Sequence, residues 1–123
     1  AKTRNELVEK GLYGGRNSGE SLHHIAETGN NSPAARQIRD MLERADIEVN
    51  GSSNGVGLVN HGGRHRGSYA EALLDRLDGI SPDKIEDELN KIAKELRDID
   101  RDITDGRIDA RDAVKEWTDR QRN

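Results

Sequence analysis

The sequence predicts an α+β fold, in which two short strands accompany several amphipathic helices. Glycine divides the chain, because twelve of the 13 glycines lie within residues 1–80. All four histidines lie in that part as well. A glycine-rich, irregular segment is typical of functional loops held on a scaffold. The remaining residues, 81–123, are highly charged and have the apolar spacing of helices.

Residues 81–123 predict an antiparallel helical hairpin. Ser81-Pro82-Asp83 supplies an N-cap, a proline at the first helical position and an acidic first turn. Apolar residues then recur every three or four positions, at Ile85, Leu89, Ile92, Leu96 and Ile99. Thr104-Asp105-Gly106 ends this helix. A second helix is expected from about Asp109, with one side formed by Ala110, Ala113, Val114 and Trp117.

The first part predicts short elements in the order strand, helix, strand, helix. After a short helix over residues 5–10, the expected elements are a strand over 21–26, a helix from Ser32-Pro33 to about 44, a strand over 56–59 and a helix over 68–77. Asn50-Gly51 and Asn54-Gly55 are turn formers. If the two strands pair, His24 and His65 come close together.

Composition limits the function classes. Hydrophobic residues make up 31% and charged residues 36% of the 123 residues, with no Phe, so the core is built from Leu, Ile, Val and Ala. The chain has no cysteine, and a metal site therefore uses His, Asp, Glu, Asn or water. No run approaches the ~18 apolar residues of a membrane span. The net charge of −4 argues against a broad electrostatic grip on nucleic acid and leaves Arg64-His65-Arg66 as the local basic cluster.

The histidines form two groups, His23-His24 and His61-Gly-Gly-Arg-His65. Neutral imidazole binds divalent metals and acts as a base near pH 7. Neighbouring residues of a strand point to opposite faces, so one histidine of the first pair can bind metal while the other acts as a base or packs. His61 and His65 have the i, i+4 spacing of two ligands on a helix, but the intervening glycines favour a turn at His61. This spacing predicts a one-metal nuclease site.

These residues also carry a resemblance. The stretch from His23-His24-Ile25 through Asn54-Gly55-Val56 to His61-x-x-x-His65-x-x-x-Tyr69 resembles the AHH family of nuclease domains. That family belongs to the HNH/endonuclease VII (ββα-metal) superfamily and occurs as C-terminal toxin domains of bacterial polymorphic toxins. The segment Ala45-Asp46-Ile47-Glu48-Val49-Asn50 is similar to another part of the family pattern. Leu22 stands where the family usually has Ala, and Gly57-Leu58-Val59 replaces a bulkier strand, which predicts looser packing.

The resemblance covers residues 20–78 and implies three segments. Residues 1–20 are an N-terminal arm, and residues 21–80 are a ββα-metal, HNH-like nuclease core with an inserted helix. Residues 81–123 are the C-terminal helical hairpin, packed on or beside that core and outside the resemblance.

The resemblance also implies roles for single residues. His24 is the expected general base, His23, His61 and His65 are metal ligands, and Asn54 braces the loop and orients the base. Independently of the resemblance, three further residues are expected to bind substrate. Arg64 and Arg66 flank the metal group as phosphate contacts, and the Tyr69 hydroxyl either reaches a phosphate or packs in the core.

The expected function is metal-dependent hydrolysis of phosphodiester bonds by an endonuclease that cuts DNA. The cofactor is one divalent ion, Mg, Mn, Ni or Zn, with imidazole favouring the transition metals. The resemblance implies a toxin of interbacterial competition that is secreted or injected, acts in the cytoplasm of the target cell and is held by a cognate immunity protein in the producer. Apart from that partner the chain is expected to be monomeric.

Two alternatives remain from the sequence. The same site can belong to a ribonuclease toxin. The histidines can also tie loops together in a non-enzymatic, metal-stabilised interaction module whose residues 81–123 bind a partner. The enzyme and the module differ at the metal, since an enzyme keeps an open coordination position and a free base, whereas four protein ligands close a structural site.

Overall fold

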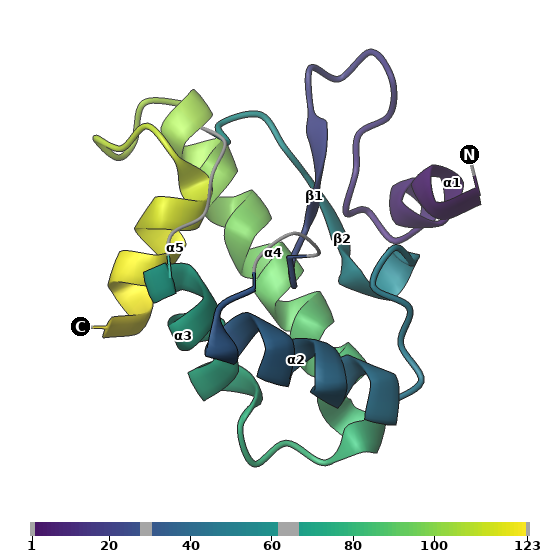
Figure 1. The fold of residues 1–123 in the computed structure, drawn as a ribbon. Helices are drawn as coiled ribbons and strands as arrows, with labels where there is room; N and C mark the ends of the chain where they lie inside the picture. The colour runs from purple at the N-terminus through teal and green to yellow at the C-terminus, as the bar shows by residue number, and fades with distance from the viewer. Residues whose placement is uncertain (1, 28–30, 62–66, 123) are drawn as a thin grey trace.

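The computed structural model describes residues 2–27, 31–61 and 67–122, and within these it has the predicted α+β architecture. Its elements, in chain order, are α1 (Lys2–Glu9), β1 (Ser21–His24), α2 (Pro33–Arg44), β2 (Gly55–Leu58), α3 (Gly67–Leu77), α4 (Ile85–Thr104) and α5 (Ala113–Arg122) (Figure 1). Short 3-10 turns, Ser52–Asn54 and Pro82–Lys84, precede β2 and α4. Each element predicted from the sequence is present, and only the ends differ.

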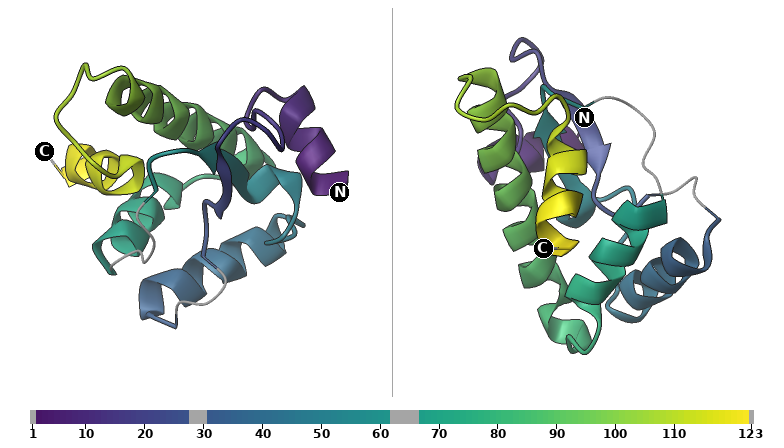
Figure 2. Two further views of the ribbon diagram at one scale, coloured as in Figure 1. Left: turned by 90° about the horizontal axis from the view of Figure 1, so that it is seen from above. Right: turned by 90° about the vertical axis from the view of Figure 1, so that its left-hand side faces the viewer.

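The two strands form an antiparallel sheet with α2 inserted between them in the sequence. Ser21 pairs with Leu58 at one end and His24 pairs with Gly55 at the other. A two-stranded sheet is marginally stable by itself in water, so its faces need cover. Seen from above, α4 runs along one side of the sheet and α2 along the other, while α1 and α5 lie at opposite ends (Figure 2).

A single large hydrophobic cluster joins these elements. It extends from Leu7 of α1 to Trp117 of α5 and includes the apolar face of α4 that the helical spacing predicts. Ile92, Ala93 and Leu96 of that face are fully buried. The N-terminal helix, the sheet and the C-terminal helices therefore share one core.

Side-chain caps explain where the structure departs from the expected element ends. The last helix begins at Ala113 rather than near Asp109, because the Asp112 carboxylate accepts hydrogen bonds from the amides of Val114 (2.9 Å) and Lys115 (3.1 Å). Ser81 is the N-cap residue of a 3-10 turn instead of α4 itself, and its hydroxyl donates to the Asp83 carboxylate at 2.6 Å. A 3-10 turn over Pro82–Lys84 consequently precedes α4.

The expectation of loose packing at Gly57 is wrong. A Cβ atom placed there would lie 2.3 Å from Glu20 Oε1 and 2.7 Å from Tyr13 Cδ1. The segment before β1 thus fills the space that a larger strand residue would take. Arg97 of α4 fixes the same point, because its Nη1 donates to the Gly57 carbonyl at 2.9 Å and to Glu20 Oε1 at 2.6 Å.

No helix in the described part of the chain is long and apolar enough to cross a membrane.

The close approach at Gly57 gives the first prediction. Gly57→Ala forces a methyl group against Tyr13 and Glu20, and we expect the free energy of unfolding to fall by about 1–3 kcal/mol. Urea denaturation followed by circular dichroism measures this. Ser21→Ala, at an exposed position of β1, is the matched control and should change stability by less than ~0.5 kcal/mol. Equal stabilities of the two variants would contradict the packing described here.

Candidate active site

His23 and His61 lie together on the inner side of the sheet. His23 is only 5% exposed and pairs across the strands with the fully buried Val56. His61 follows β2 and precedes α3, as the glycines after it predict. The centroids of the two imidazole rings are 4.6 Å apart, and the ring planes are inclined by 60°. Two residues 38 positions apart in the sequence thus meet at one point.

This ring separation fits two ligands of one ion. With metal–nitrogen bonds of about 2.1 Å, two imidazoles on one ion have centroids roughly 4.6 Å apart at a right angle and roughly 5.3 Å apart at the tetrahedral angle of zinc sites, so a small movement of the rings admits either geometry. Within residues 2–27, 31–61 and 67–122, no group of three or more His, Cys, Asp or Glu is arranged to hold a metal. The predicted third ligand, His65, lies outside the described residues, as do Arg64 and Arg66.

His24 lies on the opposite side of β1 from His23, as strand alternation predicts. His23 is buried and His24 is exposed. The cross-strand partner of His24 is Gly55, whose missing side chain leaves space for Leu7 of α1. The two neighbouring imidazoles therefore have different surroundings, one in the protein interior and one in water.

Asn54 holds the backbone that leaves β1. It is fully buried, its Oδ1 accepts from the Ala26 amide at 2.7 Å, and its Nδ2 donates to the carbonyls of Ala26 (3.0 Å) and Val49 (2.8 Å). Its own carbonyl accepts from the amide of Ile25 at 2.9 Å. These bonds end β1 at His24, two residues earlier than expected. The bracing expected of Asn54 is therefore exerted on the main chain directly after His24.

Tyr69 lies in the core, and its surroundings speak against the expected contact with a phosphate. The side chain is 2% exposed, and its hydroxyl donates to the carbonyl of Ile25. Burial, together with the negative charge of Glu27, raises the pKa of the phenol well above its usual range. The neutral hydroxyl thus ties α3 to the backbone beyond His24.

A row of rings connects His61 to the C-terminal helix. The His23 ring lies edge-on to Tyr69 at 6.2 Å, and Tyr69 lies edge-on to Trp117 of α5 at 5.7 Å. The Trp117 indole N–H donates to Glu95 of α4 at 2.9 Å. Such edge-to-face contacts favour defined ring orientations. Helix α5 thereby supports His23 through the rings of Trp117 and Tyr69, and His23 in turn contacts His61.

Glu27 is a residue near this region that the sequence did not single out. Its Oε1 atom is buried and has no hydrogen-bond partner among the described residues. Burial raises the pKa of this carboxyl group. It lines a small hollow with Tyr69 and residues of α2 and α3, including Ala35 and Ala70. No spacing rule marks a single glutamate after a strand, so only the fold reveals its burial.

The raised pKa of Glu27 makes its ionised form a source of instability. A carboxyl whose pKa is raised in the folded state favours folding below its unfolded pKa, near 4.5, and loses that contribution as the pH rises through the folded value. We therefore expect Glu27→Gln to be more stable than the wild type at pH 7, with the difference shrinking towards pH 4. Thermal unfolding from pH 4 to 8 measures this, with Glu48→Gln as an exposed control. A Glu27→Gln protein less stable at pH 7 would show that the ionised carboxylate has a stabilising partner.

Comparison with known proteins identifies the family. Residues 4–103 match the profile of AHH, a nuclease family of the HNH/ENDO VII superfamily with conserved AHH. The match is longer than the resemblance over residues 20–78, since it includes most of α1 and nearly all of α4. Neither the curated proteins nor the solved structures compared with the chain gave a match. The profile spans most of the chain, and the protein therefore belongs to the AHH family of nucleases.

Proposed function

We propose that the protein is a metal-dependent endonuclease that hydrolyses DNA, with His23, His61 and His65 as metal ligands and His24 as general base. The observation that carries this proposal is the meeting of the His23 and His61 rings at 4.6 Å, with the next residue of the strand, His24, exposed to water. Membership of a nuclease family supports the reaction class.

A bound divalent ion would supply Lewis-acid stabilisation of negative charge on the phosphate and the leaving oxygen. The residues of the chain have separate tasks. His23, His61 and His65 would hold the ion through imidazole nitrogens. His24, the exposed last residue of β1, would accept a proton from the attacking water as its oxygen bonds to phosphorus and one P–O ester bond breaks. Asn54 fixes the main chain that follows His24.

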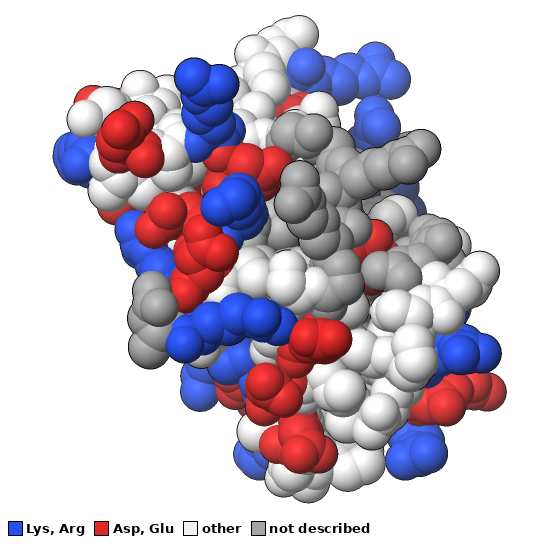
Figure 3. Space-filling model, turned by 60° about the vertical axis from the view of Figure 1, so that its left-hand side comes forward, with Lys and Arg blue, Asp and Glu red and all other residues white. Residues whose placement is uncertain are grey.

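The surface charge is consistent with local rather than broad phosphate binding. On the face seen in Figure 3, basic and acidic side chains lie next to each other without forming a continuous basic surface. The net charge of −4 agrees with this mixture. Because affinity for a nucleic acid backbone depends on neutralised phosphates, we propose that Arg64 and Arg66 provide those contacts close to the metal.

Removal of the His24 ring tests the proposed base. We expect His24→Ala to lower the rate of plasmid cleavage by about 10²–10⁴-fold, because proton transfer by a positioned base contributes that factor. The assay uses purified protein with magnesium, manganese, nickel or zinc, and with EDTA. Since His24 is exposed, the melting temperature should stay within a few degrees of the wild type.

Ser21→Ala is the matched control, an exposed residue of the same strand that should retain full activity. If the protein cleaves labelled RNA and not the plasmid, the substrate is RNA and the proposed site residues stay the same. A folded wild-type protein that cuts neither nucleic acid with any metal would contradict the proposal. Loss of the fold in His24→Ala would instead favour a structural role for the histidine pair.

We further propose that the protein acts as a toxin domain in competition between bacteria, delivered into the cytoplasm of the target cell and held by an immunity protein in the producer. The resemblance to toxin modules supports this role. Because the net charge of the chain is −4, the immunity protein does not need to be strongly acidic. Expression in a bacterial cytoplasm should be toxic, and the His24→Ala variant should abolish that toxicity.

The mixed charge also predicts how the immunity complex responds to salt. We expect its affinity to change by less than about tenfold between 50 and 500 mM salt, because exposed charge pairs that salt screens contribute little to such an interface. Calorimetric titration with the inactive His24→Ala variant measures the affinity. A fall of several orders of magnitude would show an interface dominated by opposite charges and contradict this expectation.

A further inference from the structure

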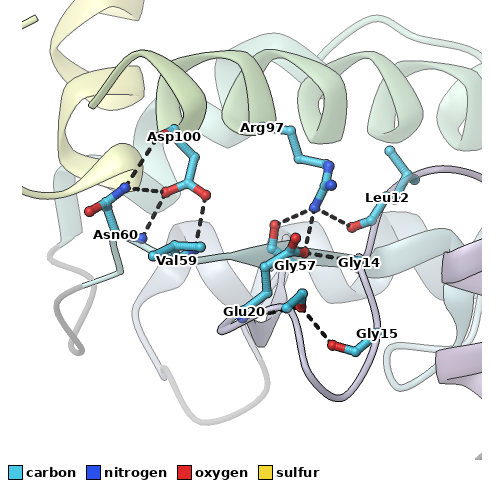
Figure 4. Close-up of polar contacts among 10 residues, drawn as sticks. Leu12, Gly14, Gly15, Glu20, Gly57, Val59, Asn60, Arg97 and Asp100 are labelled. Carbon is cyan, nitrogen blue, oxygen red and sulfur yellow. Dashed lines mark hydrogen bonds and ion pairs between the residues drawn. The ribbon is translucent and has the colours of Figure 1, made fainter. Parts of the chain in front are cut away.

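Asp100 of α4 is a buried carboxylate that binds the end of β2. It is 6% exposed, although it continues the apolar stripe of Ile92 and Leu96 at four-residue spacing. Its Oδ2 accepts from the amide of Val59 at 2.8 Å, and its Oδ1 accepts from the amide of Asn60 at 2.7 Å (Figure 4). No lysine or arginine in the described part of the chain pairs with this carboxylate.

Asn60 is bound by α4 and by the first residue of α5. Its Nδ2 lies 2.9 Å from Asp100 Oδ1, 3.1 Å from the Asp100 carbonyl and 2.8 Å from the hydroxyl of Thr104. Its own carbonyl accepts from the amide of Ala113, the first residue of α5, at 2.8 Å. The amides of Val59 and Asn60 and the carbonyl of Asn60 are thus bound by the C-terminal helices after the strand pairing has ended at Leu58.

This arrangement fixes the chain directly before His61. Two hydrogen bonds from consecutive amides to one carboxyl group hold two successive peptide planes. The backbone angles at residues 59 and 60 set where His61 leaves the strand. The neighbouring Val59 side chain is 48% exposed, so its packing contributes little to that direction.

We propose that Asp100 is a positioning residue, which holds His61 against His23 by fixing the backbone of residues 59 and 60. The C-terminal helices then act as part of the site through the backbone that they hold. The value of this position for catalysis rests on the proposed metal site, but the contact between the two rings exists without metal.

The direct test is Asp100→Asn, which keeps the size of the side chain but replaces one acceptor by an amide donor facing a backbone N–H. The first readout is NMR of the imidazole resonances in the metal-free protein, assigned with His23→Gln and His61→Gln. We expect the His61 and His23 signals to shift or broaden, while those of His24, on the other face of β1, keep their positions.

The second readout is metal affinity, measured by calorimetric titration with nickel or zinc alone. Mutation of a residue that orients a metal ligand typically lowers the metal affinity by 10–100-fold, and we expect a loss in this range for Asp100→Asn. Asp98→Asn, an exposed residue of the same helix, should bind as the wild type does. Ile92→Val weakens the core around α4 without touching Asn60, and it separates lost stability from lost positioning.

The proposal would be overturned if a folded Asp100→Asn protein kept both its His61 signals and its metal affinity. It would also be overturned if Ile92→Val, at the same melting temperature, lost as much metal affinity as Asp100→Asn. If Asp100→Asn does not fold, Thr104→Val removes one contact of Asn60 at an exposed position. It should shift the His61 signals in the same direction by a smaller amount, and unchanged signals there would also overturn the proposal. A wild-type protein that cuts no nucleic acid but whose His61 responds to these variants would refute the proposed function and leave the positioning role intact.

Discussion

The register of the β1–β2 pair is the constraint on which the rest of the structure depends. Because side chains alternate along a strand, a shift of one residue would move His23 to the outer face and His24 to the inner one. The observed register pairs His23 with Val56 and thereby brings its ring to that of His61. Four pairs of residues in an isolated two-stranded sheet cannot secure this register, so contacts outside the sheet must do so. Arg97 and Glu20 fix it at Gly57, and Asn54 fixes it at the other end.

These contacts explain why a nuclease core of two strands and a helix occurs within a larger helical body. Helix α4 supplies Arg97 to the middle of β2 and Asp100 to its end, and the two side chains lie on adjacent turns of one buried face (Figure 4). Helix α5 contributes Trp117, which packs edge-on against Tyr69, and Tyr69 in turn packs against the His23 ring. The family profile extends to residue 103 and includes both α4 residues, in agreement with a structural unit larger than the strands and α3 alone.

Much of this fold could be predicted from local signals. Ser32 and Pro33 mark the start of α2, where the Ser32 hydroxyl caps the helix, and strand alternation separates His23 from His24. The apolar spacing of Ile92, Leu96 and Ile99 does not single out Asp100, whose burial and partner at Asn60 follow only from tertiary packing. Glu27 carries no such signal, and the burial of Tyr69 depends on how α3 meets the chain after β1. Long-range hydrogen bonds of this kind link segments about 40 residues apart, beyond the reach of periodicity.

The central claim is that His23 and His61 hold one metal ion in a nuclease site. Anomalous diffraction from crystals of the zinc- or nickel-loaded protein, recorded above and below the metal absorption edge, tests it most directly. We expect one strong peak within about 2.0–2.3 Å of a nitrogen of each imidazole. A metal bound elsewhere, such as at the carboxylates of α2 or α4, with both histidines uncoordinated, would contradict it.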